Sequence, residues 1–349
     1  MVTFRFRIAG LVAFTPLMLG LGVVGAPASA SADGGTSCSD AGATGLTAAL
    51  VASPGQRIGP DTIDAAGCDI GIYIGPGVTG VRVNGVTVSG ANDHGIFAQD
   101  TSNLVIENST VEGNGVAPHA VRSDKAVQLA GTSNSIVRDN VVKGNFSGGI
   151  DITDDGAIDP GALNPGTLMA ARNDLIMGNQ ISGNFGECGL VVSAYNKGAG
   201  VSDNTLIRNT VTGRTGVFSA QGPVIGAIVV AADTPWTSAL DNSVVGNTVT
   251  GSFLAGIIVH SNAPGDLVSG TVVSSNVVSS NGWGKTDGPP VRVGVILATR
   301  AATAALTHST VAANRITDED YGIWISAAAD TALGGLPLDR ADTPVVRAP

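Results

Sequence analysis

Short segments in which hydrophobic and polar positions alternate recur along most of the chain. A word of the form Asn-x-Val/Ile-x-Gly begins at Asn140, Asn179, Asn209 and Asn247, and it loosens at Asn276 and Asn314. The intervals between successive words are 39, 30, 38, 29 and 38 residues. Alternation with β-branched residues predicts short strands, and a word returning at roughly regular intervals predicts a repeat architecture.

A second recurring segment, of the form small–apolar–x–apolar, accompanies each word. Stacked in parallel about 4.8 Å apart, one such strand per coil forms a continuous aliphatic inner column. Asn at each corner tolerates a left-handed backbone, and its amide can bond to the Asn above and below. The second position is apolar in all nine copies of the segment: Ile72, Ile96, Val127, Ile150, Leu190, Ile228, Ile257, Val295 and Ile323.

The two ends of the chain carry other signals. Arg5 and Arg7, an apolar run over 8–24 and the small residues Ala28-Ser29-Ala30 predict a secretory signal peptide over 1–30. Residues 31–60 are predicted to cap the first coil, with a short amphipathic helix over 41–53 that protects the exposed sheet edge. The coils are predicted to occupy 61–330, followed by a C-terminal tail over 331–349.

Composition narrows the classes of function. The formal net charge is −10, so nucleic-acid binding, which needs a basic surface, is excluded. No later apolar run approaches the roughly 20 residues of a membrane span, so the mature chain is predicted to be secreted, extracellular and monomeric. Export permits a Cys38–Cys68 disulfide, and Cys188 is predicted to be a small buried hydrophobe.

These segments resemble the N-x-V-x-G-N and G-I-x-V coil signatures of right-handed parallel β-helix proteins, the pectin-lyase-like superfamily. The resemblance covers roughly 61–328 and implies an all-β, single-stranded solenoid of about eight or nine coils. It rests on core and corner positions, so it implies no single activity. Pectate and alginate lyases, polygalacturonases, uronan epimerases, phage tailspikes, adhesins and copper-site maturation proteins share the fold.

The candidate catalytic and metal-binding residues are outward-facing ones, which the stacking of coils arranges in rows along the helix axis. Asp155 and Asp233, two coils apart at about 10 Å, suit the acid and base of inverting glycoside hydrolysis. Alternatively, Asp151, Asp154 and Asp155 hold Ca²⁺, which acidifies the C5 proton of a uronate for abstraction or stabilisation by a neighbouring side chain. The third outward row and its neighbour supply the residues for these roles: Asp155, Tyr195, Asp233, Asn262, Arg300 and, two residues before Asn262, His260.

A polar segment before the Asp151 coil adds positive charge. His119, Arg122 and Lys125 are predicted, with Asn262, to bind a polyuronate. The alternative to both proposals is a solvated rim of strand ends with surface ion pairs in the loop.

Known activity motifs are matched only in part. Thr153–Gly156, reading TDDG, resembles the acidic motif of polygalacturonases, but their Gly-His-Gly and Arg-x-Lys motifs have no match. Ala117-Pro118-His119 resembles the Asp-Pro-His motif of alginate epimerases without its acid.

The leading hypothesis is a secreted protein that binds or processes an acidic or cell-surface polysaccharide, as a lyase, hydrolase or epimerase, with Ca²⁺ as an optional cofactor. The rival hypothesis is a non-catalytic extracellular or adhesive scaffold, and whether the protein is an enzyme stays open.

Overall fold

The computed structural model describes residues 37–115, 125–154, 170–186, 188–213, 226–253, 255–282, 292–326, 329–334 and 341–347. The chain divides into two units, Met1–Gly35 and Thr36–Pro349, and everything below concerns the second. The predicted signal peptide lies outside the described residues.

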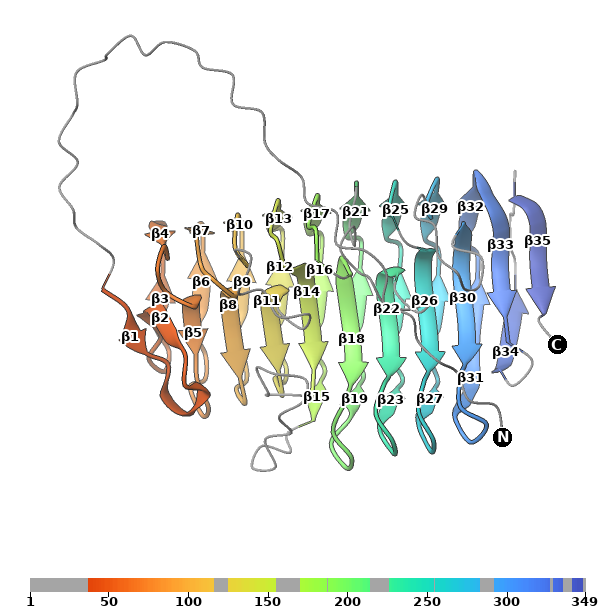
Figure 1. The fold of residues 1–349 in the computed structure, drawn as a ribbon, viewed down its shortest axis with the longest axis horizontal. Coiled ribbons are helices and arrows are strands. Elements are labelled where there is room, and N and C mark those ends of the chain that lie inside the picture. Colours follow the sequence, from red (N-terminus) through yellow and green to blue (C-terminus); the bar gives the residue numbers. More distant parts are fainter. Residues whose placement is uncertain are drawn as a thin grey trace, which may run out of the picture. The chain divides into compact units, whose positions relative to one another are not determined.

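The described strands stack into three sheets, here called A, B and C (Figure 1). A coil therefore contributes one strand to sheet A, one to sheet C and one or two to sheet B, and not the single strand per coil that was predicted. All pairings are parallel except β1 with β2. Because the strands of sheets B and C are mostly two or three residues long, a turn follows almost every one and the chain winds around a narrow interior.

Most strands of sheet A are five to seven residues long, and they follow one another across the sheet in sequence order. They are β1 (Ser39–Asp40), β2 (Thr47–Val51), β5 (Ile70–Ile74), β8 (His94–Gln99), β11 (Lys125–Ala130), β14 (Gly148–Thr153), β18 (Leu190–Ala194), β22 (Gly226–Ala232), β26 (Ala255–Ser261), β30 (Val293–Thr299), β33 (Glu319–Ile325) and β35 (Ala341–Arg347). Since β35 pairs with β33, sheet A continues beyond residue 330.

Sheets B and C close the other two sides of each coil. Sheet C contains β4 (Thr62–Asp64), β7 (Thr87–Ser89), β10 (Thr110–Glu112), β13 (Val141–Lys143), β17 (Gln180–Ser182), β21 (Thr210–Thr212), β25 (Thr248–Thr250), β29 (Val277–Ser279) and β32 (Arg315–Thr317). Sheet B contains β3 (Arg57–Ile58), β6 (Arg82–Asn84), β9 (Val105–Glu107), β12 (Ile136–Arg138), β15 (Ala171–Arg172), β16 (Leu175–Met177), β19 (Val201–Ser202), β20 (Thr205–Ile207), β23 (Ser238–Leu240), β24 (Ser243–Val245), β27 (Leu267–Ser269), β28 (Val272–Ser274), β31 (Ala305–Ala312) and β34 (Ala329–Gly334).

The N-terminal cap is a strand and not the predicted amphipathic helix over 41–53. Only Gly42–Thr44 is helical, as one 3-10 turn called η1. Thr47–Val51 pairs with β5, which places Leu50 beside Ile72. A strand satisfies the hydrogen-bonding groups of the first coil's edge directly, which a helix lying across it cannot do. The Cys38–Cys68 disulfide is confirmed and fastens this segment to the first coil.

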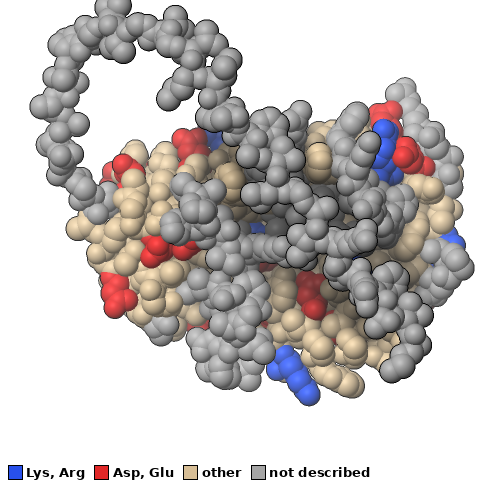
Figure 2. Space-filling view, in the orientation of Figure 1, with Lys and Arg blue, Asp and Glu red and all other residues tan. Residues whose placement is uncertain are grey.

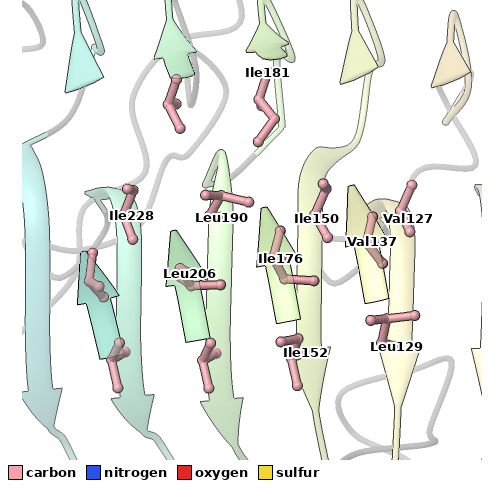
Figure 3. Packing of buried hydrophobic residues seen from close by; sticks show 14 of the residues in the cluster. Val127, Leu129, Val137, Ile150, Ile152, Ile176, Ile181, Leu190, Leu206 and Ile228 are labelled. Atoms are coloured by element: carbon pink, nitrogen blue, oxygen red, sulfur yellow. The ribbon is translucent and has the colours of Figure 1, made fainter. Parts of the chain in front are cut away.

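The predicted inner column is confirmed. Register places Ile150 beside Leu190, Leu190 beside Ile228 and Ile228 beside Ile257. Figure 3 shows Ile150, Leu190 and Ile228 in line on sheet A, across the interior from Ile176 of sheet B. Burial of one aliphatic side chain per strand at about 25 cal/mol per Å² stabilises the stack.

The small residue before each inner position leaves room for the neighbouring coil. A Cβ on Gly149 would lie 2.1 Å from the backbone oxygen of Gly189 and 3.0 Å from the side chain of Ile181 on sheet C. The backbones of consecutive coils therefore approach where sheet A bends, which explains the small–apolar–x–apolar pattern.

The corner Asn residues form the predicted ladder of amides. Each donates its backbone N–H to the Oδ1 of the next: Asn140, Asn179, Asn209, Asn247, Asn276 and Asn314. The predicted left-handed backbone is wrong by one residue, because positive φ falls on the preceding Asp139, Arg208, Ser275 and Ala313. That exposed residue turns the chain, and the following Asn points its amide inward.

An ion-pair cluster on sheet B links three coils. The Glu107 side chain, 1% exposed, pairs with Arg82 on one side and accepts a 2.8 Å hydrogen bond from Arg138 Nε on the other. Chiefly through the Arg138 hydrogen bond, the pKa of Glu107 is held below its usual 4.5. A lowered pKa in the folded state contributes stability that is present above pH 4.5 and is lost as pH falls through the lowered pKa.

We therefore expect Glu107→Gln to lower the free energy of unfolding by about 1 kcal/mol at neutral pH. The difference from the wild type should close in acid, where both side chains are neutral. Chemical denaturation across pH checks this, and a deficit that stays constant into acid would contradict it.

Candidate functional site

Sheet A presents outer side chains in register, as predicted. The first outer row runs through Asp151, Val191, Val229 and Ile258. Its apolar members pack into a second hydrophobic cluster with Cys188, which is 5% exposed. The outer face from β18 to β30 is therefore apolar, and Asp151, itself 5% exposed, marks its polar border on β14.

The second outer row brings His260 to the edge of this apolar face, beside Ala231. Its Nδ1 lies 3.6 Å from Oδ1 of Asp233, and the two side chains are 4% and 18% exposed. Burial lowers the pKa of His260 below its ordinary value; Asp233 opposes this effect and Arg300 adds to it. His260 is therefore neutral at neutral pH, and its Nδ1 lies beside the Asp233 carboxylate, just beyond hydrogen-bond distance.

Four consecutive turns extend the third outer row along one edge of sheet A. We call this edge the ledge; it comprises residues 195–199, 233–237, 262–266 and 300–304. Backbone bonds from Asp233 N to Ala194 O and from Arg300 N to Ser261 O keep it in register. Arg300 is exposed and donates a 3.4 Å hydrogen bond to Oδ1 of Asn262. The ledge thus brings Tyr195, Asp233, Asn262 and Arg300 together.

Asp154 stabilises the first turn of the ledge through hydrogen bonds. Its carboxylate accepts hydrogen bonds from the backbone N–H groups of Tyr195 at 2.6 Å, Asn196 at 3.2 Å and Gly200 at 2.7 Å. A carboxylate engaged by three backbone donors and 1% exposed holds the turn in shape. Sequence reasoning took the same residue for a Ca²⁺ ligand.

Lys125 lies on sheet A and not in an exposed loop. It is 3% exposed, and its backbone oxygen is 3.1 Å from Nδ1 of His94. Burial lowers the pKa of His94 to about 4, so this imidazole is neutral too. His94 and Lys125 form a separate polar site toward the N-terminal coils, away from the ledge.

Three predicted site residues, His119, Arg122 and Asp155, lie outside the described residues. Within the described part of the chain, no group of three or more His, Cys, Asp or Glu side chains is placed to hold a metal ion. The predicted Ca²⁺ site includes Asp155 and stays a prediction.

Sequence reasoning missed two residues of the ledge, Lys197 and Trp236. Trp236 is 62% exposed, the largest exposure among the described large hydrophobic side chains, and Lys197 Nζ lies 5.6 Å from its ring centroid. In the sequence, only an alignment of the turns "YNKGA" and "DTPWT" would have indicated that these two side chains belong to neighbouring turns of the ledge.

Two further regions of the described surface show no concentrated charge. The described part of the face in Figure 2 carries scattered acidic and basic residues among neutral ones. On sheet C, a shallow open hollow is lined by Ser89, Glu112, Lys143 and Ser182. Lys143 and Glu112 there form a 3.0 Å ion pair, so the lysine's charge is already matched.

Comparison with known proteins identifies the class of fold to which this chain belongs. Residues 37–160 match the family described as the right handed beta helix region, and the chain has the fold of a right-handed parallel β-helix. No curated protein matches the sequence. Among the described residues, the structure has no helix of the length and apolarity that crossing a membrane requires.

Two solved structures from Azotobacter vinelandii share the fold. The A-module of the mannuronan C-5 epimerase AlgE6 aligns with a TM-score of 0.52 at 16% identity, over 80% of this chain and 69% of its own. The A-module of AlgE4, also a mannuronan C-5 epimerase, aligns with a TM-score of 0.51 at 14% identity, over 87% and 84%. At these identities the likeness establishes the fold.

Proposed function

We propose that this protein is exported, binds an acidic polysaccharide along the ledge and abstracts a proton from a uronate ring. The observation that carries the proposal is the pair of a buried, neutral His260 and Asp233, with the exposed cation of Arg300 on the same edge. The likeness to two epimerase modules supports it at the level of fold only.

Each residue has a defined role in the proposed chemistry. In this proposal the Asp233 carboxylate, 3.6 Å from Nδ1 of His260, favours the tautomer that carries its proton on Nδ1, so Nε2 is the nitrogen that takes the substrate proton. Arg300, with Asn262 beside it, binds the uronate carboxylate, and its charge stabilises the negative charge that develops when the adjacent C5 proton leaves. Tyr195, in the same row, is the group that returns a proton in this proposal. Asp151 borders the site, and a Ca²⁺ held with Asp155 would add to the stabilisation.

Deuterium incorporation tests this step without presuming the product. Polygalacturonate and polymannuronate are incubated in D₂O with and without Ca²⁺, and C5 deuteration and unsaturated product are followed by NMR. The wild type is expected to exchange the C5 proton on at least one polymer, and His260→Gln to lose that rate at least about a hundredfold. Because burial lowers the pKa of His260, the wild-type rate should persist into mild acid, below the ordinary histidine range.

His308→Asn is the matched control. His308 is exposed and has a φ of 52°, a backbone conformation that Asn tolerates, so exchange should be unchanged. If the wild type binds a polyuronate but exchanges no C5 proton under any of these conditions, catalysis is refuted and the protein is an extracellular glycan-binding scaffold.

A further inference from the structure

Trp236 occupies a backbone position that its neighbours in the stack fill with glycine. The turns 195–199, 233–237 and 262–266 are equal in length, and register on both sides aligns Trp236 with Gly198 and Gly265. All three residues have positive φ, of 88°, 69° and 79°. In these three turns the position is left-handed, which glycine supplies without strain and a tryptophan does not. The fourth turn carries Thr303 at the equivalent position.

Packing does not explain the choice of tryptophan. The side chain is 62% exposed, so it gains little from burial. A strained bulky residue that also leaves most of its apolar surface in water is disfavoured on both counts, and such outliers concentrate at functional sites. The turn would form more easily with glycine at 236.

The indole of Trp236 has a neighbour in each adjacent coil. A Cβ on Gly265 would lie 2.5 Å from the indole ring, so the ring packs against the backbone of the next coil and any larger residue there would displace it. Lys197, from the preceding coil, has its Nζ 5.6 Å from the ring centroid. The ring thus has one supported side and one side that faces a cation.

We propose that Trp236 is a stacking platform for one pyranose ring of an anionic glycan, with Lys197 binding that ring's carboxylate. This inference rests on the proposed function and names a subsite beyond the His260–Asp233 pair. The apolar C–H face of the sugar packs on the indole, which supplies rigid apolar area. Lys197 moves from the ring to the carboxylate, and Arg300, on the same ledge, extends the positive charge along the chain of sugars.

The decisive variant is Trp236→Gly, which introduces the residue found at the equivalent positions of the two adjacent turns. We expect its melting temperature to equal or exceed that of the wild type, while its affinity for oligogalacturonate falls at least about tenfold in isothermal titration. Lys197→Ala should weaken binding of oligogalacturonate and leave binding of a neutral galactan oligomer unchanged. Val277→Ala, an exposed apolar residue on sheet C, is the control and should change neither quantity.

The outcomes separate this proposal from the proposed function. If the wild type binds oligogalacturonate and Trp236→Gly binds it equally well, the platform is refuted and the proposed function stands. A Trp236→Gly protein that melts several degrees lower would show a structural role and also refute the platform. If the wild type binds neither oligogalacturonate nor oligomannuronate, the proposed function fails and the platform fails with it.

Discussion

Asn209→Leu is expected to destabilise the protein by about 3 kcal/mol or more, although the new side chain has a similar volume. Oδ1 of Asn209 accepts bonds from the backbone and side-chain nitrogens of Asn179 at 3.0 and 2.9 Å. Its Nδ2 donates to the backbone oxygen of Ile176 at 2.9 Å and to Oδ1 of Asn247 at 3.0 Å. Leucine leaves the Asn179 N–H and the Ile176 oxygen without these partners, and Nδ2 of Asn179 and Oδ1 of Asn247 each keep only one. Each buried group left unpaired costs about 1–3 kcal/mol.

Denaturant unfolding measures this loss. The matched control is Asn108→Gly: Asn108 is exposed with a φ of 51°, and glycine adopts that backbone freely, so the change should stay within about 0.5 kcal/mol. If Asn209→Leu were as stable as the wild type, aliphatic packing alone would hold the coils together and the ladder would be dispensable.

The second large effect has the opposite sign: Asp174→Asn should stabilise the protein at neutral pH. Asp174 stands in a corner column where the next coils carry Asn204 and Asn242. Its carboxylate is 1% exposed and accepts bonds from Thr132 Oγ1 at 2.6 Å and Ser135 N at 2.8 Å. Burial nevertheless raises the pKa of Asp174 from 3.8 to about 6.

The direction of that shift fixes the pH dependence. A carboxyl whose pKa is raised in the folded state favours folding only while protonated, so stability is present below pH 3.8 and is lost as pH rises through about 6. Over that shift the loss amounts to about 3 kcal/mol. Asn carries no charge, so the variant should be more stable than the wild type near pH 8. This difference in stability should disappear near pH 4, where Asp174 of the wild type is protonated.

Stability against pH for the wild type, Asp174→Asn and Asp203→Asn tests this. Asp203 is exposed with a φ of 59°, and Asn tolerates that backbone, so its curve should follow the wild type. If Asp174→Asn is less stable near pH 8, the hydrogen bonds from Thr132 and Ser135 outweigh the cost of burying the charge.

The inner column and the Asn ladder were predictable because each repeats one residue type in one environment. Ile150, Leu190 and Ile228 are aliphatic since they meet one another in every coil. The division of each coil among three sheets was not predictable from periodicity, because strands as short as Val201–Ser202 contain no full alternation. The helix predicted over 41–53 was wrong for a related reason, because Leu46 and Leu50 have helical spacing. In the structure Leu50 faces the core beside Ile72, and Leu46 packs with Ile70 on the outer face.

The row that forms the ledge was predicted because register in sheet A extends into the turns. Its chemistry was only partly visible. Asp154 and Asp151 look alike in the sequence, yet one accepts bonds from a turn and the other lies on the outer face of β14. The proximity of His260 to Asp233 follows from their side-chain directions, and the unusual position of Trp236 follows from its backbone and its two glycine neighbours. None of these is encoded in spacing alone.

Hydrogen–deuterium exchange with bound glycan tests the central claim most directly. The protein is saturated with oligogalacturonate or oligomannuronate, and amide protection is mapped by mass spectrometry against the free protein. Protection is expected in the ledge, at residues 195–199, 233–237, 262–266 and 300–304. Protection centred instead on Ser89, Lys143 and Ser182 of sheet C, with the ledge unchanged, would contradict the assignment of the glycan-binding surface.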